Sequence, residues 1–174
     1  MPGDWVHAAS QDLVRHIVTR HHAYARSAGP RLAALLAVAA ARQSREHPEL
    51  LEAAEIFEAL TRELAAHMVR EENVLFPLLE SLGEAPPPAL GSSLAAPIRR
   101  MTEDHDDAFA LLARLRELTG GYRIEGDGAP ELASLYRGLE EFEQDLHTHV
   151  WLENDVLFPR FAPREAELPG RVQL

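Results

Sequence analysis

The chain has 174 residues, enough for one domain with a sizeable core, and a formal net charge of −11. That charge is unfavourable for binding a nucleic-acid backbone or an anionic membrane surface, so we expect neither as a partner. The absence of cysteine excludes disulfides, thiolate metal sites and iron–sulfur ligation by this chain.

The start of the chain, Met-Pro-Gly-Asp-Trp-Val-His, has neither the basic region nor the apolar region of a signal peptide. No apolar run approaches the roughly 20 residues that a membrane-spanning helix needs. We therefore expect a cytoplasmic protein.

Apolar residues recur at helical spacing in four segments of the chain. In chain order, helices are expected over about residues 11–43, 49–80, 94–118 and 130–158. Clusters rich in proline, glycine and serine separate them and mark the joints.

Short joints between long helices place neighbouring helices antiparallel. The sequence therefore predicts an all-α fold, an up-down-up-down antiparallel four-helix bundle. We expect a single domain over residues 1–174, with the bundle at about 11–161 and a C-terminal tail at 162–174.

Two stretches of the chain repeat each other. His67 and Glu71 are followed by Val-Leu-Phe-Pro, and so are His149 and Glu153, with an offset of 82 residues (149 − 67). Side chains four residues apart lie on one face of a helix. A single His-x3-Glu pair usually is a solvated pair, but two copies in register predict a pair of metal-binding combs.

A lone histidine precedes each comb at nearly the same distance. His22 lies 45 residues before His67 (67 − 22), and His105 lies 44 residues before His149 (149 − 105). With a rise of about 1.5 Å per residue, these four histidines fall at similar depths along the bundle. We expect one histidine from each helix in one layer, with Glu71 and Glu153 one turn away.

This set of side chains offers four imidazoles and two carboxylates, without sulfur, which suits iron or manganese. The sequence predicts a dinuclear site in which the two glutamates bridge two metal ions and a position stays open for a small ligand.

Several neighbouring residues have more than one interpretation. His21 competes with His22 as a ligand, and depth together with the repeat favours His22. Glu63 and Asp145 each precede a comb histidine by four residues, so they either hold its imidazole or are surface acids. Asp104 is interpreted as a solvated charge, and His47 as a turn residue remote from the metals.

With these motifs in hand, the chain resembles the hemerythrin-like (HHE cation-binding) family, and most closely the di-iron domain of the repair-of-iron-centres (RIC) proteins. The likeness covers about residues 11–161 and rests on residues 13–22, 63–77, 103–106 and 145–160. It implies a non-haem di-iron site with six ligands: His22, His67, Glu71, His105, His149 and Glu153. Manganese and zinc are conceivable substitutes for iron.

The resemblance also implies a role in nitrosative or oxidative stress. That role is either the supply of iron to damaged iron–sulfur proteins or reaction with NO or O2. Redox activity toward NO, O2 or peroxide is left open, and so are an O2- or NO-sensing module and an iron-storage or ferroxidase-type protein. In the family a further histidine commonly follows the first helix, where this chain has Ser44. The family often carries a cysteine-containing N-terminal domain as well, and no cysteine is present here.

Overall fold

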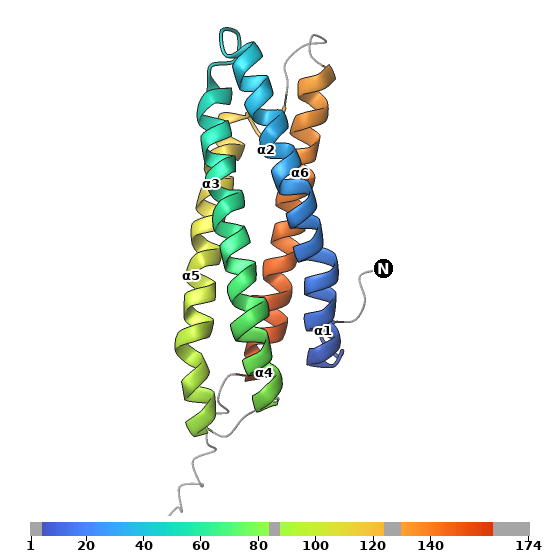
Figure 1. Cartoon of the computed structure of the whole chain (residues 1–174), viewed down its shortest axis with the longest axis vertical. Helices are drawn as coiled ribbons and strands as arrows, with labels where there is room; N and C mark the ends of the chain where they lie inside the picture. The colour runs from blue at the N-terminus through green and yellow to red at the C-terminus, as the bar shows by residue number, and fades with distance from the viewer. Residues whose placement is uncertain (1–4, 84–87, 124–129, 162–174) are drawn as a thin grey trace, which may run out of the picture.

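The computed structural model describes residues 5–83, 88–123 and 130–161. Within these residues the chain forms four helical arms that run alternately up and down (Figure 1). The first arm is α1 (Ser10–His16), the π-helical segment η1 (Ile17–His22) and α2 (Ala23–Gln43). The second is α3 (Glu49–Arg70), the π-helical segment η2 (Glu71–Leu75) and α4 (Phe76–Leu82).

The third arm is a single helix, α5 (Pro88–Leu118). The fourth is α6 (Pro130–Trp151), the π-helical segment η3 (Leu152–Leu157) and the short 3-10 turn η4 (Phe158–Phe161). The predicted all-α, antiparallel bundle is therefore confirmed. Helix α2 packs against α3 and α6, and α3 also packs against α5.

The third helix begins earlier than the sequence predicted. It starts at Pro88 and not near residue 94, so part of the expected proline-rich joint is helical. Proline is well suited to the first turn of a helix, because its φ is already helical and its missing N–H would have no partner there. The expected tail at 162–174 lies outside the described residues.

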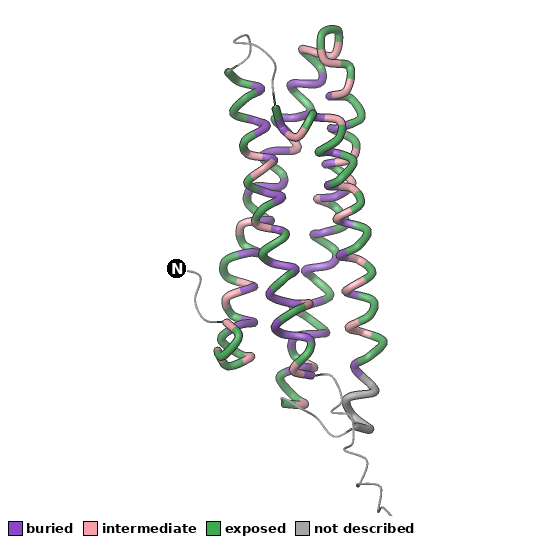
Figure 2. Tube along the Cα trace, turned by 180° about the vertical axis from the view of Figure 1, so that it is seen from behind, coloured by how far each residue is buried: buried purple, intermediate pink, exposed green. Residues whose placement is uncertain are grey.

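Buried side chains form two apolar clusters along the bundle. The larger is formed by residues between Ala25 and Val150 on α2, α3, α5 and α6. The smaller is formed by residues between Leu13 and Phe161, from α1, α4, the lower part of α5 and η3. On each arm the polar residues of the predicted metal site fall where one cluster gives way to the other. In Figure 2 the buried positions run along the inside of all the arms.

Three of the four arms change to π-helix at this same level. His22 ends η1, Glu71 begins η2 and Glu153 lies in η3. A π-turn adds a residue to the helical repeat and re-aims the side chains around it, and such turns are common at functional sites. The 3.6-residue period of the sequence alone does not predict these segments.

In the part of the chain that the structure describes, none of the helices combines the length and apolarity needed to cross a membrane.

Candidate metal centre

Six polar side chains meet inside the bundle, between the two apolar clusters. They are the four histidines and two glutamates expected from the sequence: His22, His67, Glu71, His105, His149 and Glu153. None of them is more than 3% exposed, and both glutamates are 0% exposed. Burial of this many polar groups is costly unless they satisfy one another or a bound ion.

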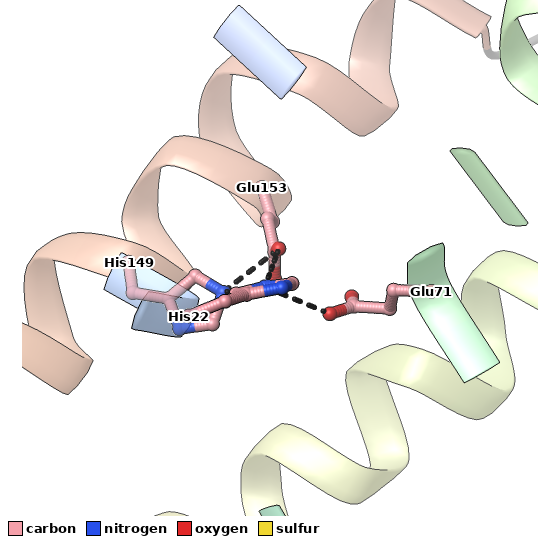
Figure 3. A group of neighbouring side chains, drawn as sticks. All are labelled: His22, Glu71, His149 and Glu153. Atoms are coloured by element: carbon pink, nitrogen blue, oxygen red, sulfur yellow. Dashed lines mark hydrogen bonds and ion pairs between the residues drawn. The ribbon is translucent and has the colours of Figure 1, made fainter. Parts of the chain in front are cut away.

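The six residues divide into two groups that share the glutamates. His22 and His149 form one group with Glu71 and Glu153, shown in Figure 3. His67 and His105 form the other group with the same two glutamates. Within each group the candidate ligand atoms lie within 4.8 Å of one another.

Each glutamate presents one oxygen to each pair of histidines. For Glu71, Oε1 lies 3.1 Å from Nε2 of His67 and Oε2 lies 3.4 Å from Nε2 of His22. For Glu153, Oε1 lies 2.9 Å from Nε2 of His149 and Oε2 lies 3.1 Å from Nε2 of His105. Both carboxylates thus lie between the two groups, with their oxygens pointing to different histidines.

The imidazoles within each group face one another through the same nitrogen. Nε2 of His22 lies 3.0 Å from Nε2 of His149, and Nε2 of His105 lies 3.0 Å from Nε2 of His67. The other nitrogen of three of these rings contacts an oxygen at the edge of the site. Donation of a proton from Nδ1 to that oxygen fixes the tautomer and leaves the Nε2 lone pair free to bind an ion.

The contacts of the histidine Nδ1 atoms follow the internal repeat as well. The residue directly after each glutamate holds the lone histidine of its own half. Nδ1 of His22 lies 2.6 Å from Oε1 of Glu72, and Nδ1 of His105 lies 3.1 Å from Oδ1 of Asn154. The two partners differ in charge, so the two groups have different surroundings.

The residue directly before each lone histidine contacts the comb histidine of the other half. Oδ2 of Asp104 lies 3.4 Å from Nδ1 of His67. In the equivalent place, the ring of His21 stacks on His149 with centroids 5.7 Å apart and an interplanar angle of 10°. The repeat therefore extends to contacts between helices, although the chemistry of these two contacts differs.

Arginines near the surface hold the outer carboxylates in place. Arg26 donates to Glu72 at 2.7 Å, and Arg70 donates to Asp104 at 2.6 Å. Arg100 lies 3.0 Å from the other oxygen of Asp104. These contacts hold the pKa values of Glu72 and Asp104 below their usual range: burial opposes the shift, and hydrogen bonds to His22 and Arg26, or to Arg70 and His67, outweigh it.

Three of the four carboxylate oxygens of the inner glutamates lack a hydrogen bond. Both oxygens of Glu71 and Oε2 of Glu153 are buried without a hydrogen-bond partner. An unpaired buried polar group is strongly unfavourable, and an unpaired charge more so. Two such carboxylates facing four imidazole nitrogens, with no sulfur, fit hard or intermediate cations such as iron and manganese.

The electrostatics of the layer also favour positive charge. Burial by itself lowers the pKa of His22, but contacts with Glu153 and Glu71 outweigh burial and raise it to about 10. Burial raises the pKa of Glu153, but His149, His105 and His22 together hold it well below its usual range. The layer thus stabilises cationic partners of its carboxylates.

The structure places three neighbouring acids: Asp104 differs from its sequence interpretation, and Glu63 and Asp145 had two interpretations open. Asp104 is not a solvated charge: its side chain is 12% exposed and contacts His67. Asp145 does not hold His149, because it lies 3.1 Å from Nδ1 of the buried His21. Glu63 lines a surface cavity, while the Nδ1 of His67 faces Asp104. These contacts join different helices, and helix spacing alone gives no signal of them.

The structure also shows where the other two candidate histidines, His21 and His47, lie. His21 is buried but lies beside the six-residue cluster and is not part of either group. His47 lies in the joint between α2 and α3 and contacts Glu49 at 3.0 Å.

A cavity of about 340 Å³ opens beside one of the two groups. It lies between α3 and α5, and its lining includes His67 and His105. Its charged lining residues are Glu63, Asp104, Asp107, Arg70 and Arg100. His22 and His149 are not part of its lining. This cavity therefore reaches the group that contains His67 and His105.

The comparison with known proteins agrees with this geometry. The family model described as the hemerythrin HHE cation binding domain matches residues 13–161, which is most of the chain. The chain belongs to the hemerythrin HHE cation-binding family. The resemblance noted in the sequence is thereby confirmed, and the His/Glu cluster of this hemerythrin-like chain supports iron binding.

Similar proteins include bacterial proteins named iron–sulfur cluster repair protein YtfE. The chain is 32% identical to the protein from Citrobacter koseri over 158 residues, which is 90% of this chain and 68% of the relative. It is 33% identical to the protein from Pectobacterium atrosepticum over 161 residues, with the same coverage. The protein from Escherichia coli O157:H7 is 32% identical over 158 residues, again with the same coverage.

Proposed function

We propose that this hemerythrin-like protein holds two iron ions and supplies iron for the repair of damaged iron–sulfur clusters under nitrosative or oxidative stress. The observation that carries the proposal is the position of the two glutamates. Each directs one oxygen to His22 or His149 and the other to His67 or His105. Two ions, each between one histidine pair and two carboxylates, would give every buried oxygen a partner.

In this proposal the six ligands are His22, His67, Glu71, His105, His149 and Glu153, with both glutamates bridging. Each ion would then be held by two imidazole nitrogens and two carboxylate oxygens of the protein. Iron commonly takes up to six ligands, so positions stay open for an oxo or hydroxo bridge and for a small molecule. This openness favours reaction with NO or O2 as a second activity of the same site.

The cavity between α3 and α5 supports the role in iron supply. It brings the surface close to His67 and His105. Glu63 and Asp107 in its lining offer carboxylates to a ferrous ion, while Asp104 is already paired with Arg70 and Arg100. The relatives are named for iron–sulfur cluster repair, which agrees with an acceptor that has lost iron from its cluster. The iron passed on is then the cargo of the protein. A cytoplasmic location stays a prediction from the sequence.

Iron transfer can be tested directly. The reduced protein is loaded with ferrous iron, its metal content is measured, and it is mixed with a cluster-free ferredoxin, a thiol and sulfide. Cluster formation is followed by visible absorbance, with a ferrous chelator present to trap free iron. We expect clusters to form faster than with the same amount of free ferrous iron.

The test variant is His67→Ala, at the cavity. The control variant is His147→Ala: the side chain of His147 is 56% exposed, and this residue lies outside both groups. The first should lower iron content and transfer, and the second should change neither. Binding of one metal or fewer per chain would overturn the dinuclear site. Two bound irons that are not transferred, but that consume NO or O2, would instead support the second activity.

A further inference from the structure

A row of aromatic rings leads from His149 to the N-terminal end of the described chain. The ring of His21 stacks on His149, with centroids 5.7 Å apart at 10°. His16 meets His21 edge-on, with centroids 5.4 Å apart at 83°. Trp5 then stacks on His16, with centroids 4.1 Å apart at 24°. Four rings in mutual contact thus join the metal centre to a partly exposed indole.

The inner part of this row is held by burial and by a hydrogen bond. His21 is only 4% exposed and contacts Asp145 at 3.1 Å through its Nδ1. His16 and His21 lie on α1 and η1, one turn apart, so the helix itself sets the distance between the two rings. The ring of His21 is therefore fixed against His149 from one side.

The outer end of the row is held by Arg160. Its guanidinium donates to the backbone carbonyls of Trp5 at 2.6 Å and of Ala8 at 2.5 Å, and to Oγ of Ser10 at 3.2 Å. Arg160 lies in η4, at the end of the fourth arm. The segment before α1 is thus tied to the arm that carries His149 and Glu153, and this tie keeps the indole of Trp5 against His16.

We propose that the row Trp5–His16–His21–His149 is an electron path between the metal pair and the protein surface. The inference rests on the proposed function, because it requires iron beside His149. Electron transfer through protein weakens steeply with distance, and rings in contact shorten each gap. Indole is among the most easily oxidised side chains, so Trp5 is the natural donor at the outer end.

This electron path would supply an electron when hydrogen peroxide reacts at the metal pair. Peroxide takes up two electrons and two protons and becomes two molecules of water. If one iron of the bound pair is ferrous, its oxidation would supply one of these electrons. The second electron leaves the indole of Trp5, whose N–H proton is released to water, and the other proton comes from solvent. Damage is thereby moved from the ligands to a residue that a surface reductant can reach.

The chain contains its own control. Trp151 is two residues from His149 and is 47% exposed, whereas Trp5 is only partly exposed. Among the described residues, the ring contacts of the row include Trp5 and not Trp151. An oxidant that diffuses through solvent should attack the more exposed Trp151, whereas the ring path predicts attack at Trp5.

The experiment uses the iron-loaded protein, treated with one equivalent of ferricyanide per metal pair and then with hydrogen peroxide. Metal content is measured first, and oxidised tryptophan is located by mass spectrometry of peptides. We expect several-fold more oxidation at Trp5 than at Trp151, and none above background in the iron-free protein. His16→Leu should abolish the preference for Trp5, while His147→Leu, a change outside the row, should keep it.

The outcomes separate the two proposals. If the protein binds no iron, both the proposed function and the path fail. If iron binds normally but Trp5 is oxidised no more than Trp151, the path alone is overturned. The same holds if His16→Leu leaves the preference for Trp5 unchanged while iron content equals that of the parent.

Discussion

Nδ1 of His22 lies 2.6 Å from Oε1 of Glu72, the residue directly after Glu71. One turn of the second arm thus supplies a carboxylate to the inner layer and another carboxylate that orients a histidine of the first arm. Glu72 is in turn held by Arg26 at 2.7 Å. A histidine oriented in this way presents Nε2 in a fixed direction and binds metal more tightly.

Replacement of Glu72 tests this orientation. Glu72→Ala removes the acceptor for Nδ1 of His22, so we expect metal affinity to fall by about 10-fold to 100-fold. Competition with a chelator of known affinity measures the change. Glu55→Ala, at an exposed acid of the same arm, is the control and should leave affinity unchanged. Equal affinities for both variants and the parent would show that Glu72 does not support the ligand.

The second prediction tests whether His22, in the histidine layer, and not His47, in the joint between α2 and α3, is needed for iron binding. His22→Ala should weaken or abolish the binding of one iron, because it removes a completely buried ring from one of the two groups. His47→Ala should leave both irons in place, since His47 contacts Glu49 in the joint. Elemental analysis after saturation with ferrous iron gives the result. Loss of iron from the His47 variant alone would contradict the ligand assignment.

The third prediction concerns the bridging role of the glutamates. Glu71→Gln keeps the size of the side chain but removes the charge that faces His22 and His67. We expect faster release of iron to a chelator and a longer metal–metal distance, because a buried pair of cations loses a compensating charge. X-ray absorption measures the distance. Glu55→Gln serves as the exposed control. A parent-like distance and release rate in the Glu71 variant would rule out bridging by this residue.

The fourth prediction concerns the tie between the two ends of the described bundle. Arg160→Met removes the hydrogen bonds to the carbonyls of Trp5 and Ala8 and so should free the indole from His16. In a Trp151→Phe background, the remaining tryptophan reports on this contact alone. We expect its fluorescence to be quenched more strongly by acrylamide, with iron content unchanged. Arg15→Met is the matched control, because Arg15 is exposed and contacts Asp12. Quenching equal to that of the control would mean that the indole is held by other contacts.

The sequence was sufficient for the parts of this structure that depend on position along a helix. Apolar periodicity predicted the bundle, and the spacing of His22, His67, His105 and His149 predicted that they share one layer, where they do lie. Their role as metal ligands stays a prediction. Contacts between residues far apart in the sequence cannot be predicted from helical spacing. Asp145 contacts His21, 124 residues away, and not the neighbouring His149. That choice depends on how α6 is rotated against the first arm.

The π-helical segments show a second limit. Each of them adds a residue to the repeat at the level of His22, Glu71 or Glu153. Such an insertion is stabilised by what the re-aimed side chains then contact on other helices, so a local pattern does not reveal it. Asp104 is a related case. With acids on both sides of His105 it resembles a solvated charge paired at most with Arg100 of its own helix, and its contacts with His67 and Arg70 depend on the approach of α3.

The candidate metal ligands of each group come from both halves of the chain. His22 shares its group with His149, and His67 shares its group with His105, so each histidine pair takes one member from either half. In the proposed centre, neither helical hairpin alone contains the full ligand set of even one ion. Metal capture would therefore follow the docking of the two hairpins in the correct register. A bound ion would then cross-link them non-covalently, much as a disulfide does in proteins that contain cysteine.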